Sequence, residues 1–136
     1  SGDFSSVAEE DVPTVLLRAD MDALPLVEES NVDHTSLYPE AHHACGHDGH
    51  SAMLAAALVR LSSERDSRSW SGRVLGVFQP AEETGDGALQ MLTALPDELG
   101  GAGVTRGAFG MHNIPGGKLG AVMMRKEGTA ARVWHM

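Results

Sequence analysis

Short apolar runs are spaced along the chain and are separated by polar or glycine-rich stretches. The β-branched and apolar run at 14–19 predicts a buried strand, and the run at 72–79 predicts a second strand that stops at Pro80. Two shorter runs, at 108–112 and 119–124, predict two further strands. The pattern therefore indicates a sheet whose strands come from the whole length of the chain.

Two other segments carry apolar residues at helical spacing. The first covers 50–63, an alanine-rich stretch that Asp48 or Gly49 could begin. The second covers 88–95 and ends before a proline. Residues 27–42, between the first strand and the first helix, form a long polar loop, and loops of that length in compact domains are usually functional or mobile.

Strands that alternate with helices predict an α/β fold with a largely parallel sheet. In such sheets ligands gather beyond the carboxyl ends of the strands. Several acidic and imidazole side chains follow or end a predicted strand, and we expect them to meet at one edge of the sheet: Asp20, Asp22, Glu82, Glu83 and His112.

Composition narrows the classes of function. The formal charge of −9 repels phosphate backbones, so nucleic acid is not an expected partner. The hydrophobic content of 42% is too high for disorder, and no apolar run is long enough to cross a membrane. A single cysteine cannot form an intrachain disulfide, which favours a reducing compartment and a cytoplasmic location. The 136 residues suit one domain.

The segment at 43–50, His-Ala-Cys-Gly-His-Asp-Gly-His, carries the most chemistry. It places Cys45 two positions from His47 among several imidazoles, and Gly46 lets the backbone bend closely around an ion. Thiolate and imidazole are ligands of zinc-like ions. The alternative is a buried free cysteine beside surface histidines.

Acidic residues extend this pattern. One of Glu82 and Glu83 could bind a metal ion while its neighbour acts as a base, although such a pair is more often an exposed acidic turn. His112 taken alone is more often a structural residue than a ligand. Asp20 and Asp22 could orient an imidazole or could form a turn. Together the residues predict a metal-dependent hydrolase.

Four motifs in this order resemble the metal-dependent amidohydrolases related to aminoacylase and carboxypeptidase. The nearest branch contains hippurate hydrolase, the N-acyl-amino-acid amidohydrolases and the plant hydrolases of indoleacetyl–amino acid conjugates. The motifs are Arg-Ala-Asp-Met-Asp-Ala-Leu-Pro at 18–25, the cysteine–histidine segment at 43–50, Gln-Pro-Ala-Glu-Glu at 79–83, and Gly-Met-His-Asn-Ile-Pro at 110–115. The resemblance extends from about residue 15 to about residue 124.

The resemblance implies a three-layer sandwich of the zinc-exopeptidase type that cleaves the amide of N-acyl amino acids or small peptides. It implies two divalent ions, commonly zinc, with manganese, cobalt or nickel in some members. By the same resemblance the metal ligands would be Cys45, His47, Glu83 and His112, and Glu82 would be the general base. No substrate-binding residue is assigned, and a homo-oligomer remains open.

Members of this family are longer than 136 residues. They carry a lid domain after the strand that ends near residue 124, and a later segment supplies one more histidine ligand. We therefore expect residues 1–136 to be a partial catalytic, metal-binding domain without the lid. Two alternatives remain: a non-catalytic metal-binding fragment or remnant, and a hydrolase that uses Cys45 as a nucleophile paired with His47.

Overall fold

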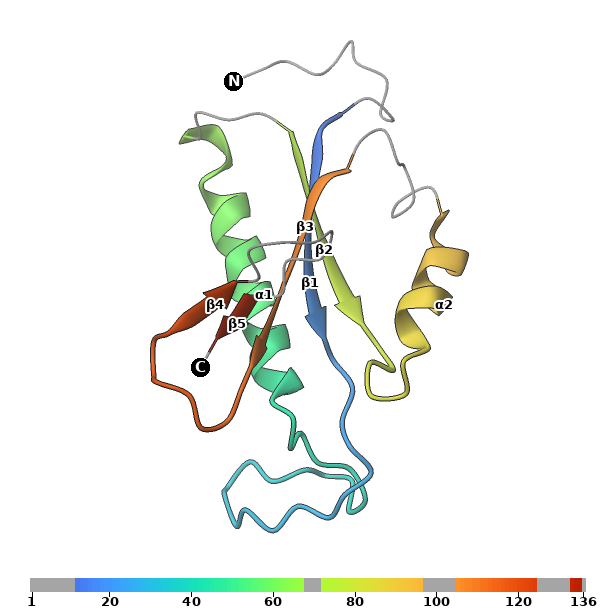
Figure 1. Cartoon of the computed structure of the whole chain (residues 1–136), viewed down its shortest axis with the longest axis vertical. Helices are drawn as coiled ribbons and strands as arrows, with labels where there is room; N and C mark the ends of the chain where they lie inside the picture. Colours follow the sequence, from blue (N-terminus) through green and yellow to red (C-terminus); the bar gives the residue numbers. More distant parts are fainter. Residues whose placement is uncertain (1–11, 68–71, 97–104, 125–132, 136) are drawn as a thin grey trace.

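The computed structural model describes residues 12–67, 72–96, 105–124 and 133–135. These residues form one sheet with helices on both of its faces (Figure 1). The elements in chain order are β1 (Thr14–Asp20), α1 (His47–Ser63), the 3-10 helix η2 (Arg65–Ser67), β2 (Arg73–Gln79), α2 (Gly87–Ala94), β3 (Thr105–Asn113), β4 (Val122–Met124) and β5 (Val133–His135).

The sheet is largely parallel, as the sequence predicted. Its strand order is β2-β1-β3-β5-β4, so β1 lies between β2 and β3 and pairs in parallel with both. β3 also pairs in parallel with β5, and only the β4–β5 pair is antiparallel. The carboxyl ends of β1, β2 and β3 therefore lie at the same edge of the sheet.

Side chains on alternate positions of β1 face two different helices. Leu17 and Ala19 line a space with Leu54 of α1, whereas Leu16 lines a space on the opposite face with Val77 of β2 and with residues of α2. This alternation is the ordinary consequence of the strand repeat. Helix, sheet and helix thus form the three layers that were expected, and Figure 1 shows α1 and α2 on opposite sides of the strands.

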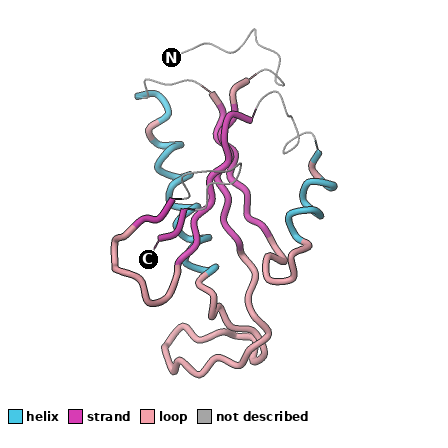
Figure 2. The backbone as a smooth tube through the Cα atoms, viewed as in Figure 1, coloured by secondary structure: helices cyan, strands magenta, loops and turns pink. Residues whose placement is uncertain are grey.

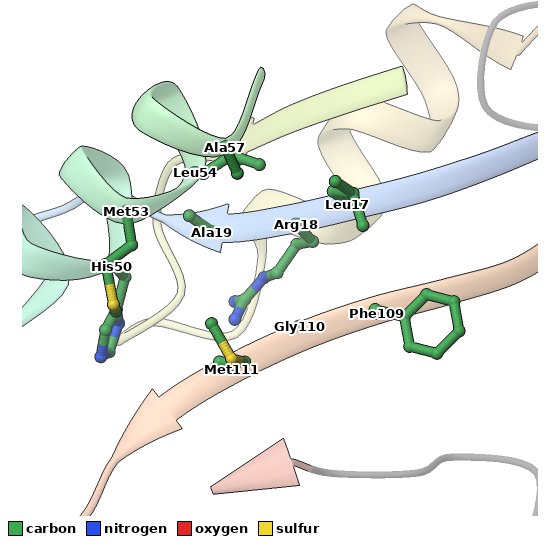
Figure 3. A pocket seen from close by; sticks show the side chains of 10 residues that line it. All are labelled: Leu17, Arg18, Ala19, His50, Met53, Leu54, Ala57, Phe109, Gly110 and Met111. Atoms are coloured by element: carbon green, nitrogen blue, oxygen red, sulfur yellow. The ribbon is translucent and has the colours of Figure 1, made fainter. Parts of the chain in front are cut away.

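The apolar core within the described residues is small. Its buried hydrophobic side chains are Ala19, Leu54 and Val77, which are 2%, 7% and 8% exposed. An apolar hollow of about 160 Å³ lies between α1 and β3, and Figure 3 shows the side chains of Met53 and Met111 turned toward it. None of the helices in the described part of the chain is long and apolar enough to cross a membrane.

A long loop extends beyond the carboxyl edge of the sheet and connects β1 to α1, as the pink tube at the bottom of Figure 2 shows. One antiparallel bridge between Leu24 and His42 brings its two ends together. The loop therefore returns the chain to the edge where β1 ended, and α1 begins there.

Three element boundaries differ by more than one residue from those that the sequence predicted. α1 begins at His47 rather than near position 50, because Gly46 takes a left-handed conformation (φ 86°) that turns the chain directly into the helix. β3 begins at Thr105 because its first residues pair with β1. The predicted fourth strand is confined to Val122–Met124, where it pairs with β5 (Val133–His135), a strand too short to show a pattern in the sequence.

Candidate metal centre

Four side chains from three separate segments gather at the carboxyl edge of the sheet. Cys45 precedes α1, His47 is the first residue of α1, Glu83 follows β2, and His112 lies near the end of β3. Ligand atoms of Cys45, His47 and Glu83 lie within 4.8 Å of one another, and the Sγ atom of Cys45 lies 3.4 Å from Nε2 of His112. The fold therefore brings together all four residues that the resemblance implied as metal ligands.

His47 is fully buried, and its two ring nitrogens have different surroundings. Nδ1 lies 2.9 Å from the backbone carbonyl oxygen of Asp22 and 3.2 Å from the Oδ1 atom of the same residue. Because both oxygens are acceptors, Nδ1 carries the proton. Nε2 is buried without a hydrogen-bond partner within the described part of the chain, and it lies 3.8 Å from Asp20 Oδ2 and 3.7 Å from Glu83 Oε1. An unpartnered imidazole nitrogen between two carboxylates is the arrangement that a cation would complete.

His112 is oriented in the same way. Its Nδ1–H donates to the carbonyl oxygen of Asn113 at 2.6 Å, so the proton is on Nδ1 and Nε2 faces the sulfur of Cys45. The His47 and His112 rings stand edge to face, with centroids 5.4 Å apart. Histidines that bind a metal ion usually have the other ring nitrogen fixed by an oxygen acceptor, and both residues meet that condition.

Asp22 links the two sides of this cluster. Its Oδ1 atom lies near His47 Nδ1, and its Oδ2 atom accepts a hydrogen bond from the backbone N–H of Glu83 at 3.1 Å. Burial alone would raise the pKa of Asp22, but the backbone N–H groups of Glu83 and Glu82 and the bond from His47 lower it overall. The contacts favour the interpretation that Asp22 orients an imidazole over the interpretation as a simple turn residue.

Asp20 belongs to a second, adjoining group that contains His50. Its Oδ1 atom lies 2.6 Å from His50 Nδ1, and its Oδ2 atom accepts from Arg18 Nη1 at 2.8 Å. Burial acts to raise the pKa of Asp20, yet the His50 hydrogen bond and the Arg18 charge lower it overall. Asp20, His47, His50 and His112 also have ligand atoms within 4.8 Å of one another, but both oxygens of Asp20 are already engaged. Cys45 and Glu83, on the other side of His47, therefore form the stronger candidate for a metal centre.

His50 is a site residue whose contacts the sequence did not reveal. It is 4% exposed, and its position three residues after His47 places both imidazoles on one face of the first turn of α1. That spacing was the available signal. It was not used, because the predicted helix began near position 50 and left His47 outside it, and it does not indicate the partners of His50, which lie on strands distant in sequence.

Cys45 is a weak acid in these surroundings. Burial, followed by the hydrogen bond and charge of Glu83 and the charges of Glu82 and Asp20, raises the pKa of the thiol to about 11. A thiolate there requires a nearby cation, and coordinating metal ions deprotonate thiols. The imidazole nitrogen in contact with the sulfur, at 3.4 Å, belongs to His112. The donor set of one thiol, two imidazoles and one carboxylate fits a zinc-like ion.

Glu82 lies half-buried beside this donor set, next to Glu83 in the turn after β2. Ala81, immediately before it, has a positive φ of 51°, a conformation uncommon for a residue with a Cβ atom. Residues held in such conformations are concentrated at functional sites. The turn thereby directs two adjacent carboxylates to the carboxyl edge of the sheet.

The sequence profile of peptidase family M20/M25/M40 matches residues 16–127. Two hydrolases described as uncharacterized, from Staphylococcus saprophyticus and Staphylococcus haemolyticus, are each 38% identical over 118 and 123 residues, which is 87% of this chain and 30% of each relative. The Bacillus subtilis YXEP protein, described as a dinuclear metal binding peptidase from the M20 family, matches with a TM-score of 0.69 and 38% identity. That match covers 85% of this chain and 30% of the YXEP chain.

The chain thus spans about 30% of the length of these relatives. The family profile nevertheless covers most of the chain, and it includes the segments that carry all four clustered side chains and Glu82. The chain belongs to peptidase family M20/M25/M40.

Proposed function

We propose that the protein containing this chain is a metal-dependent hydrolase that cleaves the amide bond of N-acyl amino acids or small peptides. Two divalent ions, with zinc as the first choice, would be held by Cys45, His47, Glu83 and His112. Glu82 would be the general base. The activity is proposed for the intact protein, because the chain spans about 30% of its relatives.

The observation that carries this proposal is the Nε2 atom of His47. It is fully buried, it has no hydrogen-bond partner within the described residues, and Glu83 Oε1 lies 3.7 Å from it. Leaving such a nitrogen unpaired costs roughly 1–3 kcal/mol. A cation bound by His47, Cys45 and Glu83 would remove that cost and would also offset the gathered negative charge.

The donor set determines what chemistry is available. When bound, divalent ions supply Lewis acidity, which polarises a carbonyl oxygen and makes water a stronger nucleophile. The residues of this chain supply the orientation: Asp22 fixes the ring of His47, and the carbonyl of Asn113 fixes the ring of His112. Prior orientation of this kind lowers the reorganisation needed during the reaction.

Glu82 would move the proton. Its carboxylate accepts a proton from the attacking water and then delivers it to the nitrogen of the leaving amine, which leaves poorly as an anion. Glu83, the next residue, stays engaged at the cluster. Adjacent side chains in a turn point in different directions, so one can serve as a ligand while the other faces the substrate.

The variant Glu82→Gln tests this assignment. It keeps the shape of the side chain but removes the base, so we expect kcat to fall about 100- to 10,000-fold while the bound metal content stays unchanged. Metal content would be measured by elemental analysis, and hydrolysis with a panel of N-acyl amino acids and dipeptides. Asp86→Asn is the matched control, because Asp86 is an exposed carboxylate in the same turn and caps α2 without a side-chain hydrogen bond.

Two results would contradict the proposal. A Glu82→Gln enzyme with full activity would remove Glu82 from the reaction. An intact protein that retains metal but hydrolyses no member of the panel would instead support the alternative of a non-catalytic metal-binding protein.

The alternative of a cysteine nucleophile has less support in the geometry. A nucleophilic thiol needs a lowered pKa and a paired base, whereas the pKa of Cys45 is raised to about 11. It also leaves the unpartnered nitrogen of His47 without a role. Activity that survives exhaustive treatment with a chelator would favour this alternative.

A further inference from the structure

His50 is a buried imidazole to which the proposed chemistry gives no role. It is 4% exposed, and its ring centroid lies 5.6 Å from that of His47 and 4.6 Å from that of His112. A buried polar ring normally has both nitrogens hydrogen-bonded. The partners of His50 therefore indicate what it does between the two proposed ligands.

The two ring nitrogens of His50 join the ends of two strands. Nδ1 lies 2.6 Å from the Oδ1 atom of Asp20, an acceptor, so Nδ1 carries the proton and donates. The backbone N–H of Asn113 donates to Nε2 at 3.1 Å. The Oδ1 atom of the Asn113 side chain also lies 2.7 Å from Nε2. Because an amide oxygen only accepts, a half-turn of the amide that exchanges Oδ1 with the NH₂ group turns this contact into a hydrogen bond to the unprotonated Nε2. His50 thus connects the end of β1 to the end of β3.

Asp20, at one end of this connection, is itself held in place by hydrogen bonds. Its second oxygen accepts from Arg18 Nη1 at 2.8 Å, and Arg18 Nε donates to Gln79 Oε1 at the end of β2 at 2.9 Å. The carboxylate is fully buried, so water does not compete for these bonds. These hydrogen bonds therefore hold together the ends of β1 and β2 and the first turn of α1. His50 then extends the network to β3.

The connection continues through the backbone of Asn113 to His112. The N–H group of Asn113 donates to His50 Nε2, and the carbonyl oxygen of Asn113 accepts from the Nδ1–H of His112 at 2.6 Å. The Nε2 atom of His112 then faces Cys45 Sγ at 3.4 Å. A shift of the Asn113 backbone would rotate the imidazole of His112 relative to the sulfur.

We propose that His50 is a positioning residue, which fixes the His112 ring against Cys45 through the backbone of Asn113 while remaining outside the set of ligands. The proposal rests on the proposed metal centre. In this role His50 sets the distance and angle between two proposed ligands from different segments, His112 of β3 and Cys45 before α1. Loss of outer partners of this kind typically weakens metal binding about 10- to 100-fold.

Two amide variants separate the two bonds of His50. In His50→Gln the carboxamide reaches the place of Nε2, and its oxygen can accept from the N–H of Asn113. In His50→Asn the shorter carboxamide takes the place of Nδ1 and can only donate to Asp20. His50→Ala removes both bonds. The matched control is Ser51→Ala, because Ser51 donates to the backbone carbonyl of Asp20 at 3.0 Å and ties the same turn to the same strand without contacting Asn113.

The measurement is titration of the intact, metal-free protein with Co²⁺ alone, followed by visible absorption and by the thiolate-to-cobalt charge-transfer band. We expect His50→Asn and His50→Ala to bind Co²⁺ about 10- to 100-fold more weakly, with an altered band, and His50→Gln to stay close to the parent. Ser51→Ala should lower the free energy of unfolding in denaturant without changing the spectrum.

The outcomes separate this inference from the proposed function. A parent protein that binds no Co²⁺ through its thiolate would overturn both. A parent that binds normally, with unchanged His50→Asn and His50→Ala, would overturn the inference alone. So would a His50→Gln variant as weak as His50→Ala, or a Ser51→Ala variant with the same spectral change.

If the His50 variants do not fold, a measurement on the unmutated protein still tests the proposal. The proposal requires a proton on Nδ1 of both His50 and His112 in the metal-free protein. Histidine ¹⁵N spectra report this directly, and a proton on Nε2 of either ring would overturn the proposal.

Discussion

Single residues at this site are held by backbone acceptors. The Nδ1–H groups of His47 and His112 each donate to a carbonyl oxygen, from Asp22 and Asn113 respectively. A backbone carbonyl can only accept a hydrogen bond, so in each neutral ring it selects the tautomer with the proton on Nδ1. The Nε2 atom of His112 is thereby left facing Cys45, and the Nε2 atom of His47 lies 3.7 Å from Glu83 Oε1.

Metal removal should make Cys45 unreactive at neutral pH. Burial and the neighbouring carboxylates raise the pKa of the thiol to about 11, so the thiolate fraction in the chelated protein rises through the whole range from neutral to alkaline pH. We expect its rate of alkylation by iodoacetamide to rise about tenfold for each pH unit below that pKa. Mass spectrometry of the alkylated peptide measures the rate.

The control for this measurement is the protein unfolded in denaturant, where the rate should level off near the ordinary thiol pKa of about 8.5. Cys45 is the single cysteine of the 136 residues, so the peptide is unambiguous. A rate that does not change with pH in the folded, chelated protein would mean a stable thiolate. It would favour a nucleophilic role for Cys45.

At the level of elements, the turn into α1 decides where the donors lie. Gly46 has φ 86° and separates Cys45 from the first helical residue, His47. A Cβ atom on Gly46 would come within 2.6 Å of Asn113 Oδ1, so the turn also packs directly against the end of β3. The helix start and the strand end are thus fitted to each other at the position where the ligands meet.

Gly46→Ala should destabilise the intact protein for two reasons, and Gly85→Ala for only one. Gly85 has φ 80° but no atom within 4 Å of the added methyl group, so only backbone strain of about 1–2 kcal/mol is expected. Gly46→Ala adds the clash with Asn113, and overpacking of this kind costs about 1–3 kcal/mol more. Urea unfolding measures both. An equal decrease in the free energy of unfolding for the two variants would show that the Asn113 side chain moves aside without an energetic cost, and would contradict this prediction.

At the level of the whole molecule, the arrangement of layers is clear but the core is thin. Among the described residues only Ala19, Leu54 and Val77 are buried hydrophobic side chains, while large apolar side chains such as Phe109 (51% exposed) lie open. The hollow between α1 and β3 adds further unfilled apolar surface (Figure 3). Since buried apolar area is the main favourable term in folding, little stability is available from these residues alone.

The 136-residue chain by itself should therefore be weakly stable. We expect it to bind the dye ANS, which reports exposed apolar surface, and to unfold at low urea concentration over a broad transition. Fluorescence and circular dichroism measure both properties, with the intact protein as the control. A sharp, cooperative transition with a free energy in the usual range of about 5–15 kcal/mol would contradict this prediction and the expectation of a partial domain.

The sequence predicted the main architecture because burial leaves a periodic trace. The runs that became β1 and β2 were identified to within one residue and the last residue of α1 was predicted correctly, and the alternation of strands and helices predicted the parallel sheet. β5 (Val133–His135) left no such trace, because three residues are too few to show a period and the strand exists through its pairing with β3 and β4. The start of α1 was missed because it depends on the left-handed conformation of Gly46.

The sequence by itself determined which donor types were available, a thiol, imidazoles and carboxylates, and that several of the acidic and imidazole side chains would meet at the carboxyl ends of parallel strands. Donor type is a property of each residue and of its place in the order of the chain, so the sequence alone is enough to give it. Only the tertiary structure decided which donors face one another: His47 leaves one nitrogen unpaired beside Glu83, whereas Asp20 is taken up by His50 and Arg18. Hydrogen-bond partners and tautomers depend on distances of a few tenths of an ångström between segments far apart in the chain, and those distances arise only when the sheet and helix pack.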